Sequence, residues 1–252
     1  MSEKNKFPTE VIDLPSGGKV YPPDSPLANG KIEIKYMTAR EEDILTSQNL
    51  IKKGVVIDTL LNALIASPDV KLDDLILGDK NAIMVAARVL AYGPEYIAAV
   101  TDPNTQEVSE HIFDLTDCPF KTIPEDVSLE NNEFVITLPA SKAEVKFKLL
   151  TGKEERVIEQ ELKSFRKMGS QVVPELTTRL RHSIISVNGE EDKPIITDFV
   201  NNMLSKDSFF LRQEMGRVAP DIELKQEIEI GGDVVTVDIP MTVEFFWPKT
   251  TA

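Results

Sequence analysis

The stretch Ile32-Glu33-Ile34-Lys35-Tyr36-Met37-Thr38-Ala39-Arg40-Glu41-Glu42-Asp43-Ile44 organises the chain, because its pattern returns in Val145-Lys146-Phe147-Lys148-Leu149-Leu150-Thr151-Gly152-Lys153-Glu154-Glu155-Arg156-Val157. Each stretch first alternates apolar with charged residues, as a half-buried strand does. Each then reaches a Thr that is followed three residues later by a Glu, which is the pattern of a capping box at the start of a helix. The sequence therefore predicts the same strand-to-helix joint twice.

The repeated joint indicates a mixed α+β protein made of two tandem copies of one unit. Each unit is expected to contain a strand, three or four helices and a projecting β-hairpin, with hairpin turns at Thr101–Thr105 and Gly231–Asp233. The predicted division is an extended Pro/Gly-rich N-terminal arm (1–30), a first α+β unit (31–127) and a second α+β unit (128–252). Chance reuse of a common capping box is the alternative to duplication.

Helix periodicity and helix-ending residues place the expected helices. They are Thr38–Lys52, Val55–Ala66, Gly78–Tyr92, Thr151–Met168 and Pro174–Ile185, with two more capped by Asp198 and Asp207 that run to Leu204 and Val218. The Gly78–Tyr92 helix is apolar almost all round, so we expect it to form the buried centre of the first unit.

Composition excludes several classes of function. The 252 residues carry a formal net charge of −14, which argues against nucleic-acid and anionic-membrane surfaces because both need basic patches. No apolar run is long enough to span a bilayer, and the polar N-terminus predicts neither secretion nor insertion. With Cys118 as the single cysteine and only two histidines, His111 and His182, no Cys/His zinc set is expected.

Catalytic motifs are equally absent from the sequence. It contains no HExxH, GxSxG, Walker or Rossmann pattern, and Asp117 beside Cys118 would raise a thiol pKa rather than lower it. We therefore predict a non-enzymatic protein without catalytic residues, metal or cofactor. A hydrolase acting on cell wall or on a small substrate is the alternative from another class, and it would need a deep pocket with convergent carboxylates.

Two segments are candidates for partner binding. In the N-terminal arm, Leu14, Pro15, Val20 and Tyr21 are the expected anchors, because a Pro/Gly-rich segment can wrap a partner and become ordered on binding. Near the C-terminus, the candidates are Phe245, Phe246 and Trp247, since aromatic residues dominate interface hot spots. The alternative for this aromatic run is a final strand that completes the core of the second unit.

Several short motifs, taken in order, resemble the T4-type baseplate hub assembly protein family of contractile-tailed bacteriophages. They are Leu14-Pro15-Ser16, Tyr21-Pro22, Met37-Thr38-Ala39 with Glu41–Leu45, Gly93-Pro94-Glu95-Tyr96, Leu149–Lys153 and Phe246-Trp247-Pro248. The resemblance covers nearly the whole chain, and it brings no catalytic residues with it.

The resemblance implies an assembly factor or chaperone for the central baseplate hub, with phage baseplate hub proteins as its partners. A permanent structural subunit of the hub is the alternative within the same process. The expected location is the cytoplasm of the infected bacterium or the virion baseplate, and the sequence does not predict an oligomeric state.

Overall fold

The computed structural model describes residues 8–101, 108–230, 233–239, 241 and 243–247, and it confirms the mixed α+β class. The strands are β1 (Thr9–Asp13), β2 (Lys31–Lys35), β3 (Glu95–Thr101), β4 (Val108–Asp114), β5 (Phe134–Thr137), β6 (Glu144–Phe147), β7 (Ile184–Val187), β8 (Lys225–Ile230) and β9 (Asp233–Asp238). The α-helices are α1 (Ala39–Thr46), α2 (Gln48–Lys53), α3 (Val56–Leu64), α4 (Leu77–Tyr92), α5 (Gly152–Lys167), α6 (Glu175–Ser183), α7 (Lys193–Asn201) and α8 (Ser205–Val218). Short 3-10 turns are η1 (Leu72–Asp74), η2 (Leu115–Asp117), η3 (Glu130–Asn132) and η4 (Val243–Phe246). The predicted hairpin turns include residues 102–105, 231 and 232, which lie outside the described residues.

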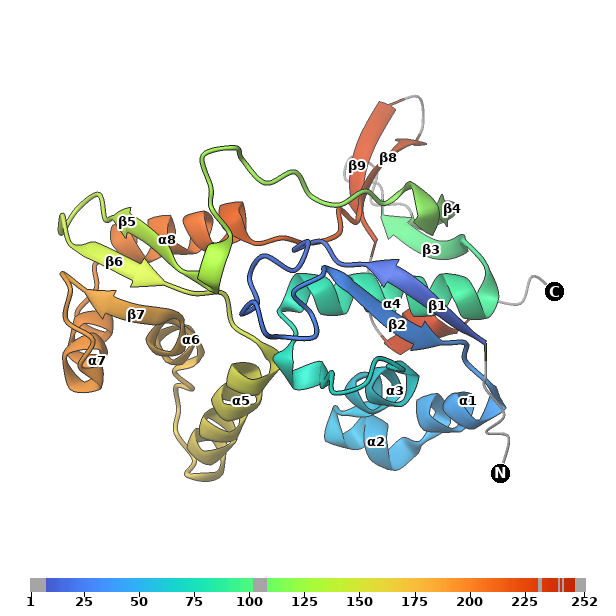
Figure 1. The fold of residues 1–252 in the computed structure, drawn as a ribbon, viewed down its shortest axis with the longest axis horizontal. Coiled ribbons are helices and arrows are strands. Elements are labelled where there is room, and N and C mark those ends of the chain that lie inside the picture. Colours follow the sequence, from blue (N-terminus) through green and yellow to red (C-terminus); the bar gives the residue numbers. More distant parts are fainter. Residues whose placement is uncertain (1–7, 102–107, 231–232, 240, 242, 248–252) are drawn as a thin grey trace.

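Residues 8–117 form a first lobe around helix α4 (Figure 1). Strands β1 and β2 pair antiparallel, with Glu10 opposite Ile34, and helices α1 to α3 pack below them. As expected, α4 is the buried centre: Ile83 is fully buried, and Val85 and Ala87 are almost so. The hairpin β3–β4 projects from the end of α4, which confirms the first predicted hairpin.

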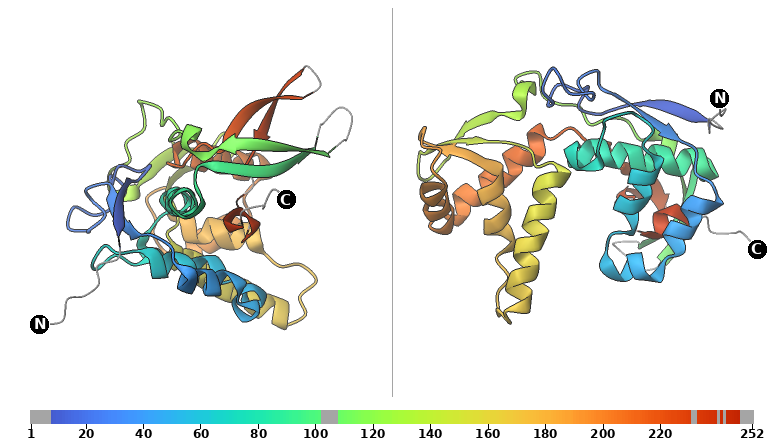
Figure 2. Two further views of the ribbon diagram at one scale, coloured as in Figure 1. Left: turned by 90° about the vertical axis from the view of Figure 1, so that its right-hand side faces the viewer. Right: turned by 60° about the horizontal axis from the view of Figure 1, so that its bottom comes forward.

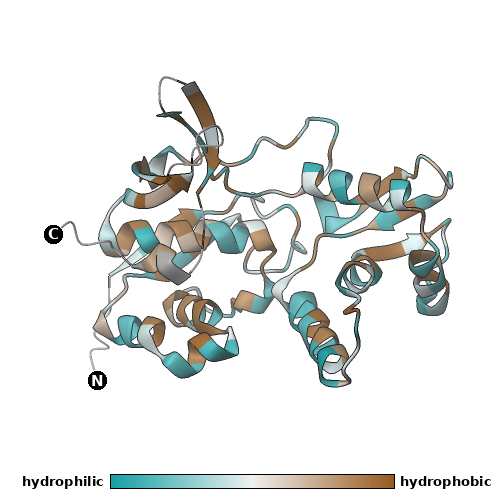
Figure 3. Cartoon of the chain, turned by 180° about the vertical axis from the view of Figure 1, so that it is seen from behind, coloured by the Kyte–Doolittle hydropathy of each residue, from teal (hydrophilic) through white to brown (hydrophobic). Residues whose placement is uncertain are grey.

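Residues 128–218 form a second lobe around a small antiparallel sheet with strand order β5-β6-β7 (Figures 1 and 2). Helices α6 and α7 contact strand β7, and α8 lies beside the sheet (Figure 1). Helix α5 packs against α6 and against η1 of the first lobe, and the pair α5–α6 projects away from the body (Figure 2). Helix α5 is amphipathic (Figure 3), with Ile158 and Leu162 buried. Hairpin β8–β9 and turn η4 follow α8 in sequence but lie beside the first lobe (Figure 1). None of the described helices is both long and apolar enough to cross a membrane.

The two predicted capping boxes are both present, at Thr38 before α1 and at Thr151 before α5. In each, the Glu at the third helical position accepts the backbone N–H of the Thr, over 3.0 Å at Glu41 and 2.9 Å at Glu154. A lysine at the end of the preceding strand completes both joints, because Lys35 pairs with Glu41 at 2.9 Å and Lys148 with Glu154 at 2.6 Å. In both joints, the same contacts therefore hold together the strand end, the cap residue and the first turn of the helix.

Two glycines allow the lobes to meet closely. A side chain on Gly78, in the first turn of α4, would lie 1.8 Å from the carbonyl oxygen of Pro220. A side chain on Gly152, in the first turn of α5, would lie 2.9 Å from the Cα atom of Asp73. The Gly152 N–H donates to Leu75 O at 3.0 Å across the same contact. Backbone therefore packs on backbone between the lobes, which fixes their relative position.

Three sequence predictions about local structure were wrong. The expected Thr38–Lys52 helix is two helices that meet at Ser47, whose backbone is extended. Asp198 lies inside α7 instead of capping a helix. Asp207 is the third residue of α8 instead of its cap, and its buried carboxylate accepts the N–H groups of Ala140 and Ser141 at 2.7 and 2.9 Å.

The aromatic C-terminal run is not a final strand. Val243–Phe246 forms the 3-10 turn η4, so alternation does not send neighbouring side chains to opposite faces. Phe245 and Phe246 are both fully buried, and their rings meet edge to face with centroids 5.6 Å apart. The core that they complete includes Tyr96 of the first lobe, 5.0 Å from the Phe245 ring.

Candidate partner-binding surfaces

The N-terminal candidates lie mostly inside the first lobe. Leu14, Val20 and Tyr21 are buried, and Pro15 is half-buried. Residues 14–30 form a series of turns, which hold the three buried side chains against the core. Their role in partner binding stays a prediction, and direct contact with a partner would require these side chains to leave the core.

A buried carboxylate fastens this segment to α4. Asp79, with none of its surface exposed, accepts the Ser16 N–H at 3.0 Å, the Ser16 hydroxyl at 2.6 Å and the Tyr21 hydroxyl at 2.5 Å. The Tyr21 oxygen in turn accepts the Ile76 N–H at 3.1 Å. Burial raises the pKa of Asp79, while the donors from Ser16 and Tyr21 favour its ionised form. A satisfied buried network of this kind rigidifies the segment that it joins.

The C-terminal candidates are held by one buried arginine. Arg88 of α4 donates to three backbone carbonyls: Phe245 O at 3.1 Å, Gly93 O at 2.9 Å and Glu95 O at 3.0 Å. Phe245 and Phe246 are buried, whereas Trp247 keeps 37% of its surface exposed. Of the three aromatic candidates, Trp247 is the one that presents side-chain surface to a partner.

A cavity of about 690 Å³ lies between α3 and η1 of the first lobe and α5 of the second. Charged side chains line it, and ion pairs join several of them: Arg156 of α5 with Asp73 of η1, and Lys80 of α4 with Asp58 of α3. The Arg156–Asp73 pair crosses from one lobe to the other. The cations and carboxylates of this lining are balanced, so we assign the cavity no ligand.

A second cavity, of about 310 Å³, adjoins the first and is more apolar. Its lining comes from the start of α4, the segment after β6, and helices α6 and α8, and includes Leu77, Leu149, Leu150, Leu176, Leu180 and Met215. Leu77 is 60% exposed and Leu176 is 43% exposed, so leucine side chains stand at its mouth. Arg212 of α8 also lines it, and its guanidinium forms no ion pair with a described carboxylate.

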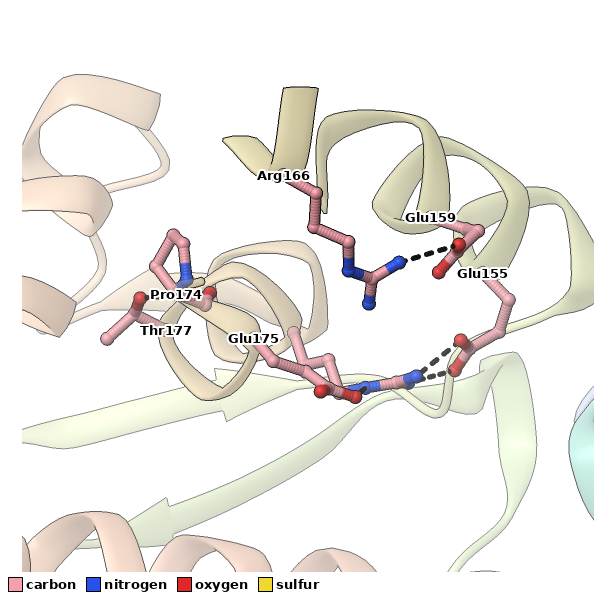
Figure 4. Close-up of polar contacts among 7 residues, drawn as sticks. Glu155, Glu159, Arg166, Pro174, Glu175 and Thr177 are labelled. Carbon is pink, nitrogen blue, oxygen red and sulfur yellow. Dashed lines mark hydrogen bonds and ion pairs between the residues drawn. The ribbon is translucent and has the colours of Figure 1, made fainter. Parts of the chain in front are cut away.

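An ion pair between α5 and α6 borders the cavities. Arg179 of α6 donates to both carboxylate oxygens of Glu155, at 2.6 and 2.8 Å, and lies 3.5 Å from Glu175 (Figure 4). Glu155 lines both cavities. One turn further along α5, Glu159 accepts from Arg166 at 3.1 Å (Figure 4). These pairs are partly exposed, so they orient the helix pair more than they stabilise it.

The described part of the chain offers no group of three or more His, Cys, Asp or Glu that could hold a metal. Cys118 is buried, burial raises the pKa of its thiol, and the Gln226 amide donates to its sulfur at 3.4 Å. His111 lies 2.9 Å from the Ser109 hydroxyl, and His182 lies 3.0 Å from Glu161. Each of these side chains therefore has a local structural contact.

Sequence reasoning missed the cavities and the buried residues Asp79 and Arg88. Charged side chains are seldom buried, so neither residue stands out in a helix that is otherwise apolar. A signal for the contact between the lobes was present in Gly78 and Gly152, which stand in the first turns of helices although glycine disfavours helix. Such glycines indicate close backbone approach.

Comparison with known proteins gives one informative result. The family model described as T4 bacteriophage base plate protein matches residues 6–247, which include both lobes and both hairpins. Searches among curated proteins and among solved structures gave no match.

Proposed function

This chain belongs to the T4 bacteriophage base plate protein family, and on that premise we propose that it is a non-enzymatic assembly factor, a chaperone, for the central baseplate hub of a contractile tail. The family match across both lobes carries the proposal. The chain acts in the cytoplasm of the infected bacterium, where its partners are phage baseplate hub proteins.

The apolar cavity between the lobes supports a chaperone role. Leu77 and Leu176 stand exposed at its mouth, and Met215 lies in its lining. Exposed apolar side chains around a concavity are typical of protein-binding sites. A hub subunit that buries an aliphatic side chain here and offers a carboxylate to Arg212 would match both the shape and the charge.

Co-purification with co-expressed hub proteins tests the proposed contact. We expect Leu77→Ser combined with Leu176→Ser to reduce the recovered hub protein about tenfold, because two leucine contacts are lost. Val11→Ser on β1 is the control, since Val11 is 57% exposed but lies far from the cavity in the first lobe. Equal recovery with the double variant and with the control would refute the cavity as the binding site.

A permanent hub subunit is the second candidate, and the same family membership favours it. Mass spectrometry of purified phage particles separates the two functions. A chaperone should be absent from finished tails and present in lysates of infected cells. Detection of this chain in stoichiometric amounts in the particles would overturn the chaperone role and leave the subunit role.

A further inference from the structure

The most exposed large apolar side chains of the described residues lie in two kinds of region, one basic and the other acidic. They are Val172 (75%), Met168 (72%), Val234 (69%), Ile112 (67%) and Val108 (66%). The first two lie at the end of the α5–α6 pair, and the other three lie on the two hairpins. Exposed aliphatic groups that cluster on projecting elements indicate a binding surface.

The end of the α5–α6 pair is basic in an otherwise acidic protein. Residues 163–174, which we name the helical tip, contain Lys163, Arg166 and Lys167 and no carboxylate, whereas the whole chain has a net charge of −14. Lys163 and Arg166 share one carboxylate, that of Glu159, at 3.6 and 3.1 Å. The helical tip therefore keeps a positive charge beside Met168 and Val172.

The outer face of hairpin β3–β4 has the complementary character. Register places Ile97 opposite Ile112 and Thr101 opposite Val108 on this face, while Tyr96 and Phe113 face the core. Three carboxylates, those of Glu95, Glu110 and Asp114, share the outer face with these aliphatic groups, and neither described strand contains a lysine or an arginine. We name it the acidic hairpin face.

The helical tip and the acidic hairpin face lie on different lobes and project in different directions (Figures 1 and 2), so they do not meet within one chain. We propose that the helical tip of one chain binds the acidic hairpin face of a second copy. Met168 and Val172 would cover Ile112 and Val108, and the tip cations would face the hairpin carboxylates.

Such a contact joins two different surfaces, so it is heterologous and leaves one tip and one hairpin face free on every pair. Repetition of the contact gives a ring or an open filament instead of a closed twofold dimer. The surface charges steer and select the pairing, and the apolar groups provide most of its affinity. The inference is independent of the role of the chain in hub assembly.

Sedimentation velocity of the full chain over a range of concentrations tests the inference. We expect the weight-average sedimentation coefficient to rise with concentration at low salt, and to rise less at high salt because salt screens exposed charges. Met168→Ser combined with Val172→Ser should weaken association about tenfold or more. Val11→Ser is the matched control, which should associate as the native chain does.

Charge reversal provides the sharpest test. A chain with Lys163→Glu and Lys167→Glu has two acidic surfaces, and a chain with Glu95→Lys and Glu110→Lys has two basic ones, so each should remain a monomer. An equimolar mixture of the two should associate again, because each tip then meets a face of opposite sign. Circular dichroism checks that all variants keep the native fold. A native chain that stays monomeric at every concentration at low salt, or a mixture of well-folded variants that does not associate, would overturn the inference.

Discussion

Replacing Arg88 by Met tests whether one buried cation holds the C-terminal segment on the first lobe. Arg88 is 3% exposed, and its guanidinium donates to the carbonyl oxygens of Phe245, Gly93 and Glu95. Methionine fills much of the space of the arginine stem but donates no hydrogen bond. The substitution therefore removes the donors and leaves most of the packing.

The expected loss follows from the three carbonyl groups that are left without a donor. A hydrogen bond to a charged group contributes about 1.5–3 kcal/mol, and three bonds to one side chain do not add fully. Removing the guanidinium also removes the cost of keeping a cation out of water, and burial already lowers the pKa of Arg88 from its ordinary value. We expect the free energy of unfolding to fall by about 3 kcal/mol.

Trp247 makes the local part of this effect measurable. It is the only tryptophan of the chain, and it follows Phe245 by two residues. Release of the Phe245 carbonyl should loosen turn η4, shift the tryptophan emission to longer wavelength and increase quenching by iodide. Urea unfolding monitored by circular dichroism gives the global loss. Arg40→Met is the control, because Arg40 is exposed on α1 and its guanidinium has no hydrogen bond or ion pair to a described residue.

An unchanged emission spectrum together with a loss below about 0.5 kcal/mol, the range of ordinary surface substitutions, would refute the role of Arg88 in holding the C-terminal segment. A large global loss with unchanged emission from the folded variant would show that Arg88 stabilises the end of α4 but not the C-terminal segment.

Three further predictions concern the joints and the contact between the lobes. Thr151→Ala should cost about 1 kcal/mol of stability in urea unfolding, because it removes the hydroxyl of a capping box. Burial would raise the pKa of Glu154, but hydrogen bonds from Lys148 and Thr151 outweigh it and lower the pKa from 4.5 to about 2. The stability that this carboxylate provides is therefore complete above pH 4.5 and is lost as the pH falls toward 2, and Glu154→Gln should flatten this part of a stability–pH curve. Gly78→Ala should destabilise by about 2 kcal/mol or more through collision with Pro220, whereas Gly216→Ala, in open space on α8, should stabilise by about 0.5–1 kcal/mol; equal thermal midpoints for the two would contradict the close contact between the lobes.

Local chemistry was predictable from the sequence where it is contained in a few neighbouring residues. The capping boxes at Thr38 and Thr151 need a Thr and a Glu three positions apart, and both formed as predicted. The same holds for hairpin β3–β4, whose strands alternate, and for the buried helix α4, which is apolar almost all round. Short-range rules succeed here because the interacting groups are also close in sequence.

Predictions failed where a distant segment decides the local structure. Asp207 has the residue type of a helix cap, but its carboxylate accepts from Ala140 and Ser141, more than sixty residues away. Phe245 and Phe246 have the pattern of a strand, yet the core of the first lobe and the Arg88 guanidinium hold them in a 3-10 turn. Neither partner is visible in the local sequence, so propensity gave the wrong element.

The inter-lobe site was not predictable for a related reason. The apolar cavity takes its lining from α4, α6, α8 and the segment after β6, which the chain brings together only after both lobes have formed. Its leucines look in sequence like ordinary core residues. Leu77 and Leu176 differ from core residues because their side chains are exposed. How far each is exposed depends on how closely the opposite lobe packs against it.

We propose that the chain arose from two copies of one unit, as the repeated joint predicts, and a second repeated contact supports this. Leu14-Pro15-Ser16 follows strand β1, and its Ser16 N–H donates to Asp79, the third residue of α4. Leu138-Pro139-Ala140-Ser141 follows strand β5, and its N–H groups donate to Asp207, the third residue of α8. Each unit would then begin with the strand before its Leu-Pro turn, so the N-terminal segment belongs to the first unit.

Two crossing segments join the lobes. After β3–β4, the chain crosses to the other unit, where the Lys121 ammonium donates to the carbonyl oxygens of Gly216 and Ala219 at the end of α8. After α8 the chain crosses back, so that hairpin β8–β9 and turn η4 lie beside the first lobe, where Arg88 of α4 donates to the carbonyl of Phe245. Each unit thus sends a segment to the last helix of the other unit, the first through the residues after β3–β4 and the second through the residues after α8. Such an exchange gives a fixed pair of lobes from units that share no continuous sheet, and it accounts for why the only tryptophan, at the end of the second unit, lies beside the first.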